Sequence, residues 1–409
     1  MSPLIKGLLQ LLVFLPPCMS AQNAPKGCFL SLKPYIGYQF ENKVDYKSNV
    51  YLSADLLYGL KTGKQSLNPY DKTYNYPEYG IGLSYTGMSM VKLPEPSYLK
   101  DFYSIYLYFG GNLIGYDRSG LSYMLEFGPA LSLGRYDPLY NPDNYYVSSP
   151  LMAHIAGGFQ VWTHLGDRFR LSANLRLRHF SNGRVALPNQ GLNMVETGIG
   201  LRYIWQTKKA DTERVVPDAS APQEVSWKRG LVLHLGLGGG LHGTEAEWLA
   251  YNEKVPSPKD RRRSFSVYPR FSLSSELLYR YDIRFATGVG TDIFYAPDLK
   301  QLEADERLAF GDAAVDAGDG YSPLSVGFSL CQEIYYRDFS AFLAVGMYAF
   351  ERMGIGNDVS WNYQRAGLRR YFRLPFLGNS DIYIGIAVKA QDFRASEYIE
   401  FSVGIGRGL

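Results

Sequence analysis

Apolar and polar residues alternate one by one along most of the chain, which is the period of a β-strand. In residues 79–86, tyrosine, isoleucine and leucine alternate with glycine, serine and threonine. Residues 123–134 and 399–406 follow the same pattern. Successive side chains of a strand point to opposite faces, so each segment has one apolar face and one face of small or polar side chains. The pattern predicts an all-β protein.

The apolar faces point inward in a soluble β-sandwich and outward in a transmembrane β-barrel, and alternation alone does not distinguish the two. Several segments are about ten residues long, the length of a tilted membrane-spanning strand. Tyrosine is abundant, with 34 residues in 409, which suits the aromatic girdles of such barrels. These features favour a transmembrane antiparallel β-barrel, with a secreted soluble β-protein as the alternative.

The N-terminus has the features of a secretory signal peptide, which we assign to residues 1–21. Lys6 precedes a short apolar core over residues 8–15, and small residues follow at the expected cleavage point. The apolar core is too short for a membrane helix. After removal of residues 1–21 the chain keeps two cysteines, Cys28 and Cys331, which are far apart in the sequence and do not form a disulfide framework. Whether they are free or paired is left open.

Eight strands are predicted before residue 207 and about eight after residue 229. The first eight begin near Phe29, Val50, Pro77, Phe102, Leu121, His154, Arg168 and Gly191. Residues 207–228 interrupt the pattern with charged residues and proline, as a linker does. We therefore predict a β-barrel over residues 22–206 and a second barrel region over 229–409. One sixteen-stranded barrel is the alternative to two tandem eight-stranded barrels.

The predicted seventh strand carries a histidine and a serine at the end of its apolar face. That face consists of Leu171, Ala173, Leu175, Leu177, His179 and Ser181, and the opposite face of Ser172, Asn174, Arg176 and Arg178. In a membrane barrel the arginine face lines the lumen, so His179 and Ser181 face lipid. If the termini are periplasmic, the odd-numbered strands run outward and this pair lies at the outer leaflet.

A serine hydroxyl becomes an effective nucleophile when a neighbouring base accepts its proton, and His179 is placed to do this for Ser181. Asn182 and the backbone N–H groups at Gly183 are candidate donors to an oxyanion. Taken alone, a His-x-Ser pair is common, and a simpler interpretation is an interfacial histidine followed by a serine that begins a loop.

The surrounding sequence is more specific than the pair. The run His179-Phe180-Ser181-Asn182-Gly183, followed by Pro188-Asn189-Gln190-Gly191, resembles the outer-membrane lipid A 3-O-deacylases (PagL-like, acyloxyacyl hydrolase). The resemblance covers roughly residues 22–206 and implies an eight-stranded barrel with its site between the last two strands. It also implies that His179 and Ser181 are catalytic and that Asn189 matches an asparagine of the family's following loop.

The second half resembles the C-terminal part of long Bacteroidetes-type relatives, for example in residues 363–369, Tyr-Gln-Arg-Ala-Gly-Leu-Arg. It contains no His-x-Ser-Asn run, so we assign it no catalytic role.

The sequence departs from the family at one position. The resemblance implies a catalytic glutamate shortly after the Pro-Asn-x-Gly run, and this chain has Asn193 there. An asparagine can orient a histidine but carries no charge to stabilise the imidazolium. Glu196 is the nearest carboxylate, and alternation places it on the lumen face with Arg176. It is therefore either a lumen salt-bridge partner or a group that reaches His179 through a β-bulge.

We therefore expect a cofactor-free carboxylic ester hydrolase of the bacterial outer membrane, with lipid A or lipopolysaccharide as substrate and outer-membrane lipids as surroundings. The net charge of +3 gives no strong bias toward nucleic acid. No Cys/His spacing indicates a metal site. The alternatives are a porin, transport or structural barrel without activity and an outer-membrane phospholipase. The acyl chain removed and the oligomeric state are left open.

One further basic run stands outside this assignment. Residues 259–263, Lys-Asp-Arg-Arg-Arg, can contact lipid phosphates if they are extracellular, and a solvated loop is the alternative.

Overall fold

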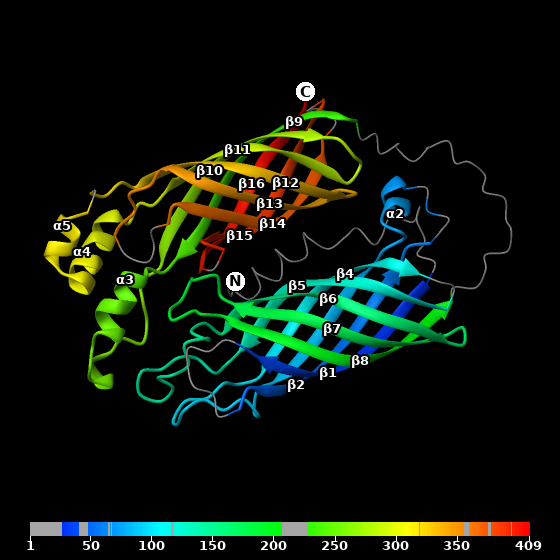
Figure 1. Ribbon diagram of the computed structural model, residues 1–409, viewed down its shortest axis with the longest axis horizontal. Helices are drawn as coiled ribbons and strands as arrows, with labels where there is room; N and C mark the ends of the chain where they lie inside the picture. The colour runs from blue at the N-terminus through cyan, green and yellow to red at the C-terminus, as the bar shows by residue number, and fades with distance from the viewer. Residues whose placement is uncertain are drawn as a thin grey trace. The chain divides into compact units, whose positions relative to one another are not determined.

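The computed structural model describes residues 27–40, 48–63, 66, 68–115, 118–206, 228–318, 320–355, 360–374, 378–393 and 395–409. The predicted signal peptide and almost all of the predicted linker lie outside these residues. The described strands form two closed antiparallel barrels (Figure 1). Each barrel is described by itself.

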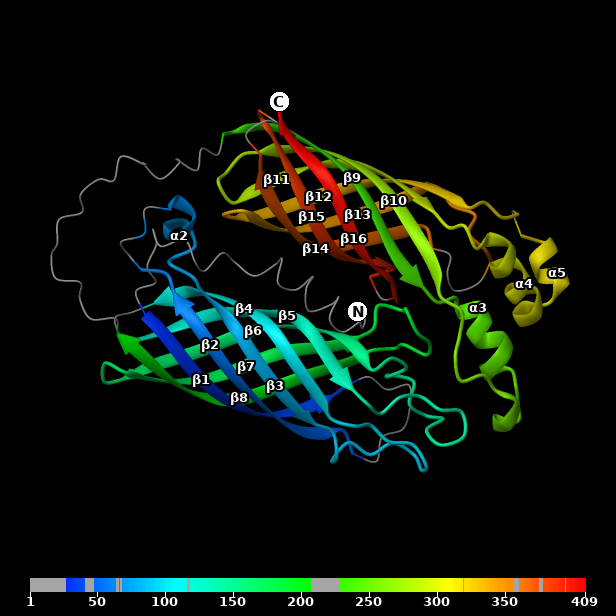
Figure 2. The same cartoon turned by 180° about the vertical axis from the view of Figure 1, so that it is seen from behind.

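The first barrel contains eight strands in chain order, with a short helix, α2 (Pro69–Thr73), between the second and third. The strands are β1 (Gly27–Gln39), β2 (Val50–Lys61), β3 (Glu78–Gly87), β4 (Phe102–Gly115), β5 (Ser119–Ser132), β6 (Leu151–Leu165), β7 (Phe169–Ser181) and β8 (Leu192–Gln206). Their starts agree with the predicted positions to within three residues. Antiparallel pairing of β1 with β8 closes the barrel, as Figure 2 shows from behind.

The second barrel repeats this arrangement. Its strands are β9 (Gly230–His242), β10 (Tyr268–Arg280), β11 (Phe285–Tyr295), β12 (Leu324–Tyr336), β13 (Phe339–Phe350), β14 (Asn362–Arg373), β15 (Ser380–Gln391) and β16 (Ala395–Gly408). Pairing of β16 with β9 closes it. Two eight-stranded barrels are therefore confirmed, and the single sixteen-stranded alternative is wrong, because β8 pairs with β1 and not with β9.

The predicted faces of the strands are confirmed. On β7, Leu175 and Leu177 are exposed on the outer face, whereas Arg176 and Arg178 are buried inside. Arg176 forms ion pairs with Glu126, at 2.8 Å, and with Asp55. An eight-stranded barrel is just wide enough for side chains, so these fill the interior, and the buried Arg176 is balanced by carboxylates.

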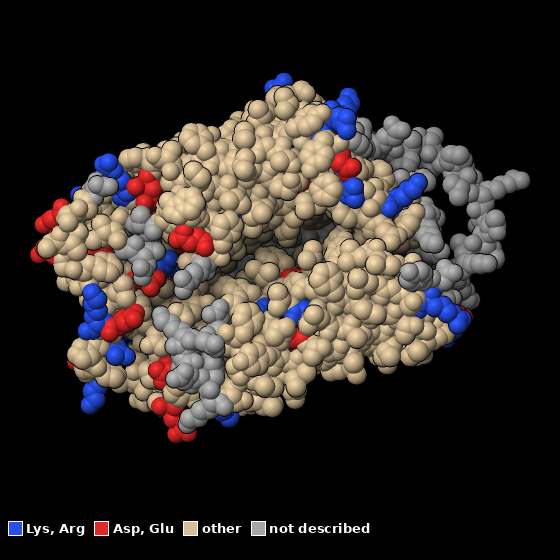
Figure 3. Space-filling model, in the orientation of Figure 1, with Lys and Arg blue, Asp and Glu red and all other residues tan. Residues whose placement is uncertain are grey.

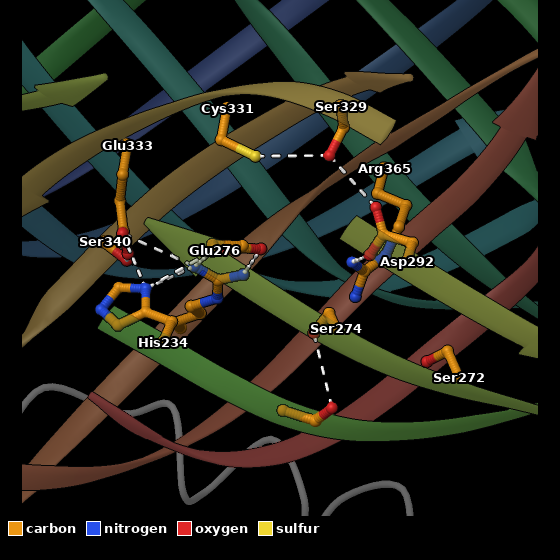
Figure 4. A network of polar contacts seen from close by, with 12 residues as sticks. His234, Ser272, Ser274, Glu276, Asp292, Ser329, Cys331, Glu333, Ser340 and Arg365 are labelled. Atoms are coloured by element: carbon orange, nitrogen blue, oxygen red, sulfur yellow. Dashed lines mark hydrogen bonds and ion pairs between the residues drawn. The ribbon is translucent and has the colours of Figure 1, made fainter. Parts of the chain in front are cut away.

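The second barrel contains a comparable interior network (Figure 4). Glu276 and Glu333 both accept from the Arg369 guanidinium, and His234 lies 3.4 Å from Glu276. Arg365 donates to Asp292 at 2.7 Å. The network ties β9, β10, β11, β12 and β14 together across the lumen. This interior is therefore also filled with paired side chains.

The two ends of the second barrel differ. Short turns at 281–284 and 337–338 lie at one end, and longer connections at 243–267, 296–323 and 351–361 lie at the other. The longer connections contain α3 (Glu245–Trp248), a π-helical turn η1 (Leu249–Glu253), a 3₁₀ turn η2 (Pro258–Asp260), α4 (Leu299–Phe310) and α5 (Asp312–Asp316). Along the wall visible in Figure 3 charged side chains are sparse, and they gather at the barrel ends. No described helix is long and apolar enough to span a membrane.

Candidate active site

Strand β7 places His179 and Ser181 at its C-terminal end on the outer face of the first barrel. His179 pairs across the sheet with Ile155, and Ser181 with Ala153. Paired residues of antiparallel strands share a face. His154, between those two partners, is buried inside the barrel, so the partners and the His–Ser pair lie on the opposite, outer side of the sheet. His179 is half-buried there, and Ser181 is only 7% exposed. The two residues are separated by about 6.6 Å along the strand, twice the rise per residue.

Strand β8 supplies the partner of the histidine. His179 and Asn193 are directly opposite in the β7–β8 register. The Nδ1 atom of His179 lies 2.7 Å from Oδ1 of Asn193. An amide oxygen only accepts, so this hydrogen bond requires the proton on Nδ1 and leaves the lone pair on Nε2. The arrangement holds the imidazole as a base whose accepting nitrogen is Nε2.

Gly191 packs against the other side of the imidazole. Its φ of +68° lies in the left-handed region. A Cβ atom at this position would lie 2.6 Å from Cε1 of His179 and 3.1 Å from the carbonyl oxygen of Phe180. Only glycine combines this backbone conformation with this close approach. The last residue of the Pro-Asn-x-Gly run therefore shapes the pocket around the histidine, a role that the sequence analysis missed.

Asn182, the predicted oxyanion donor, is buried directly after β7. Its side-chain Nδ2 donates to Oγ of Ser148, in the β5–β6 connection, at 2.9 Å. This contact orients the amide. No sequence signal pointed to Ser148, because 34 residues separate the two.

Gly183 has a φ of +62°, which suits a sharp turn after the strand. The oxyanion roles of Gly183 and Asn189 stay predictions.

The structure does not bring Glu196 to His179. Its side chain is fully buried inside the barrel, where it accepts from Ser53 Oγ at 2.6 Å and from Arg176. The β7–β8 pairing runs without a register shift, so no bulge turns Glu196 outward. The expectation of a catalytic role through a bulge was therefore wrong, and the salt-bridge interpretation is correct. The physical reason is the two-residue period, which puts Asn193 and Glu196 on opposite faces.

Within the described ranges, no group of three or more histidine, cysteine, aspartate or glutamate residues is arranged to hold a metal ion. Cys28 and Cys331 are free thiols.

Comparison with known proteins identifies a family for both barrels. A family model described as lipid A 3-O-deacylase (PagL) matches residues 35–202, and one described as the C-terminal domain of acyloxyacyl hydrolase matches residues 231–406. No curated protein matches the chain.

Solved structures of outer-membrane barrels are also similar. The outer membrane enzyme PagL matches 42% of this chain and 97% of its own, with 14% identity and a TM-score of 0.28. The NanC porin matches 92% of this chain and 100% of its own, with 6% identity and a TM-score of 0.15. The two family models together cover most of the chain, which belongs to the lipid A 3-O-deacylase (PagL) family of outer-membrane ester hydrolases.

Proposed function

We propose that the protein removes an ester-linked 3-hydroxyacyl chain from lipid A, with Ser181 as nucleophile and His179 as general base. The observation that carries this proposal is the His179–Asn193 hydrogen bond on the outer face, next to Ser181. It fixes the imidazole tautomer in which Nε2 can accept the serine proton.

In the first half of the reaction, Ser181 Oγ attacks the acyl carbonyl carbon while its proton passes to His179 Nε2. The tetrahedral intermediate collapses, the bond between the acyl carbon and the sugar oxygen breaks, and the imidazolium gives its proton to that leaving oxygen, which becomes a sugar hydroxyl. In the second half, water attacks the acyl-serine with the same histidine as base. The products are a 3-hydroxy fatty acid and partly deacylated lipid A.

The negative charge on the tetrahedral oxygen needs donors within hydrogen-bond distance. We assign these to Asn182, to backbone N–H groups at Gly183 and to Asn189. The contact of Asn182 with Ser148 supports this assignment, because an amide that is already oriented loses little freedom in the transition state.

Asn193 is a positioning residue in this scheme. It accepts from Nδ1 and holds the ring in place, and it adds no charge beside the imidazolium. The reaction therefore proceeds without the electrostatic help that a carboxylate gives.

The wall around the pair explains how a lipid substrate reaches it. Leu175, Leu177 and Ile199 are exposed on the same outer face. In an outer-membrane barrel such a face contacts acyl chains. We therefore propose that the ester of a lipid in the outer leaflet approaches Ser181, which is 7% exposed, from this side of the barrel and not through the lumen.

The alternatives receive less support. A porin needs an open lumen, and Arg176 with its three carboxylate partners lies across the interior of the first barrel. A calcium-dependent phospholipase needs a cluster of oxygen ligands near the serine. The described residues include no group of three or more histidine, cysteine, aspartate or glutamate side chains placed to hold a metal ion.

The test is mass spectrometry of lipid A from cells that produce the wild type, Ser181→Ala or Ser172→Ala. Ser172 lies on the same strand and is buried inside the barrel, so it is the matched control. We expect the wild type and Ser172→Ala to remove one hydroxyacyl chain, and Ser181→Ala to remove none. Unchanged lipid A with folded, membrane-inserted wild type contradicts the proposal.

A further inference from the structure

The basic run at residues 259–263 lies in the β9–β10 connection, at the end of the second barrel that carries the long loops. In bacterial barrels the long loops are extracellular and the short turns periplasmic. This end therefore faces the outer leaflet and the cell exterior. The catalytic scheme above uses no residue of the second barrel.

The connection has a fixed conformation. The buried side chain of Asn252 donates through Nδ2 to the carbonyl oxygen of Arg262 and accepts from the Arg262 N–H, both at 2.9 Å. Arg261 Nε donates to the carbonyl oxygen of Val255 at 2.9 Å. These bonds tie η1 to the basic run. Binding to a surface that is already ordered costs less conformational entropy than binding to a mobile loop.

The side chain of Arg262 is held on both sides. Its guanidinium lies 3.4 Å from the ring centroid of Tyr251 and donates to Glu247 at 3.0 Å. Glu247 also accepts from the N–H and the hydroxyl of Ser266. The buried Glu247 carboxylate is thus occupied by three donors, which reduces its repulsion of an incoming anion.

Positive charge prevails around this framework. Residues 251–266 contain five lysines and arginines against two acidic residues, and Glu247 is a further carboxylate that lines the hollow described next. A hollow of about 400 Å³ is lined by Glu247, Arg262, Arg263, Ser264, Phe265 and Ser266. The Arg263 side chain is 59% exposed, and Lys259 is exposed beside it. The hollow combines guanidinium groups, hydroxyl groups and an aromatic ring.

We infer that this hollow binds the phosphorylated saccharide of an outer-leaflet glycolipid. Guanidinium groups match phosphate oxygens in a bidentate geometry. The serine hydroxyls and the ring of Phe265 suit the hydroxyl groups and apolar face of a sugar. The inference rests on the outer-membrane location and not on the esterase mechanism. It gives the second barrel the role of holding a lipid headgroup, which the sequence left without a function.

The test measures binding of the full-length protein in detergent micelles with a chelator present. The probe is a water-soluble phosphorylated glycan, prepared from lipopolysaccharide by removing every acyl chain, so no ester remains to be hydrolysed. The test variant carries Lys259→Gln, Arg261→Gln and Arg263→Gln. The matched control carries Arg229→Gln, Arg284→Gln and Arg373→Gln, with the same charge change at the opposite end of the barrel.

We expect the test variant to bind at least tenfold more weakly than the wild type and the control variant to bind within twofold of it. The dephosphorylated glycan should bind at least tenfold more weakly to the wild type. A double variant with Arg261→Lys and Arg263→Lys should bind more tightly than the test variant and more weakly than the wild type. Lysine keeps the positive charge but lacks the planar guanidinium that binds phosphate through two hydrogen bonds. Each variant must show the heat-modifiable electrophoretic mobility of a folded barrel.

Three results overturn the inference. The first is an equal loss of affinity in the control variant, which indicates a nonspecific charge effect. The second is equal binding of the dephosphorylated glycan. The third is displacement by inorganic phosphate at the same concentration as the glycan, which indicates a site for free phosphate and not for a lipid headgroup.

Discussion

The hydrogen bond between His179 and Asn193 offers a direct test of the mechanism through the substitution Asn193→Asp. The two side chains have nearly the same size, so an aspartate oxygen can occupy the place of Oδ1, 2.7 Å from Nδ1. The substitution replaces a neutral acceptor with a carboxylate and leaves the geometry unchanged. Its effect therefore isolates the charge beside the imidazole.

The size of the effect follows from hydrogen-bond energies. A neutral hydrogen bond contributes about 1 kcal/mol and one to a charged group about 2 kcal/mol. The imidazolium present in the transition state gains this difference of about 1 kcal/mol, which corresponds to about a fivefold faster chemical step. The same carboxylate favours the protonated histidine of the free enzyme. The acidic limb of the pH–rate profile should therefore move to higher pH by about 0.7 unit.

The assay is hydrolysis of a chromogenic acyl ester by refolded protein in detergent micelles, measured from pH 5 to pH 9. Asn193→Asp should exceed the wild type on the alkaline plateau and lose that advantage toward acidic pH. Asn193→Ala, which removes the acceptor, should fall below the wild type at every pH by about tenfold or more. If folded Asn193→Asp shows neither a faster plateau nor a shifted limb, the asparagine does not act through the histidine.

Further predictions concern the glycine at the site, the interior charges and the lumen. Gly191→Ala should reduce hydrolysis more than tenfold, because its Cβ would meet the His179 ring. Gly166 has a similar φ of +69° with nothing within 4 Å of a Cβ, so Gly166→Ala should leave hydrolysis unchanged. Equal activity of the two variants contradicts this prediction. Arg176→Met removes one guanidinium's buried ion pairs with Asp55, Glu126 and Glu196 and should lower the free energy of unfolding by about 3–5 kcal/mol in urea titrations. The exposed Arg168→Met should change it little, and similar unfolding midpoints would refute the reasoning. Liposomes that contain the protein should not swell in sugar solutions, because paired side chains fill both interiors; swelling would show an open pore.

Much of the fold follows from the alternation of residues. The strand positions, the outward leucines of β7 and the inward Arg176 and Arg178 were all predicted from the two-residue period. The period also predicted that Glu196 would face the lumen with Arg176, away from the face of His179. The sequence did not exclude a β-bulge that would turn Glu196 toward His179. The regular β7–β8 pairing excludes it.

The sequence by itself determined the strands, their faces and the position of the His–Ser pair, because each of these depends on neighbours a few residues apart. The tertiary structure alone decided which strands close the barrels, since one ring of sixteen and two rings of eight have the same alternation. It also decided that Asn193 lies opposite His179, that Gly191 packs against the ring and that Ser148 holds Asn182. These contacts depend on register and loop path, which pairing between distant segments sets and no local pattern encodes.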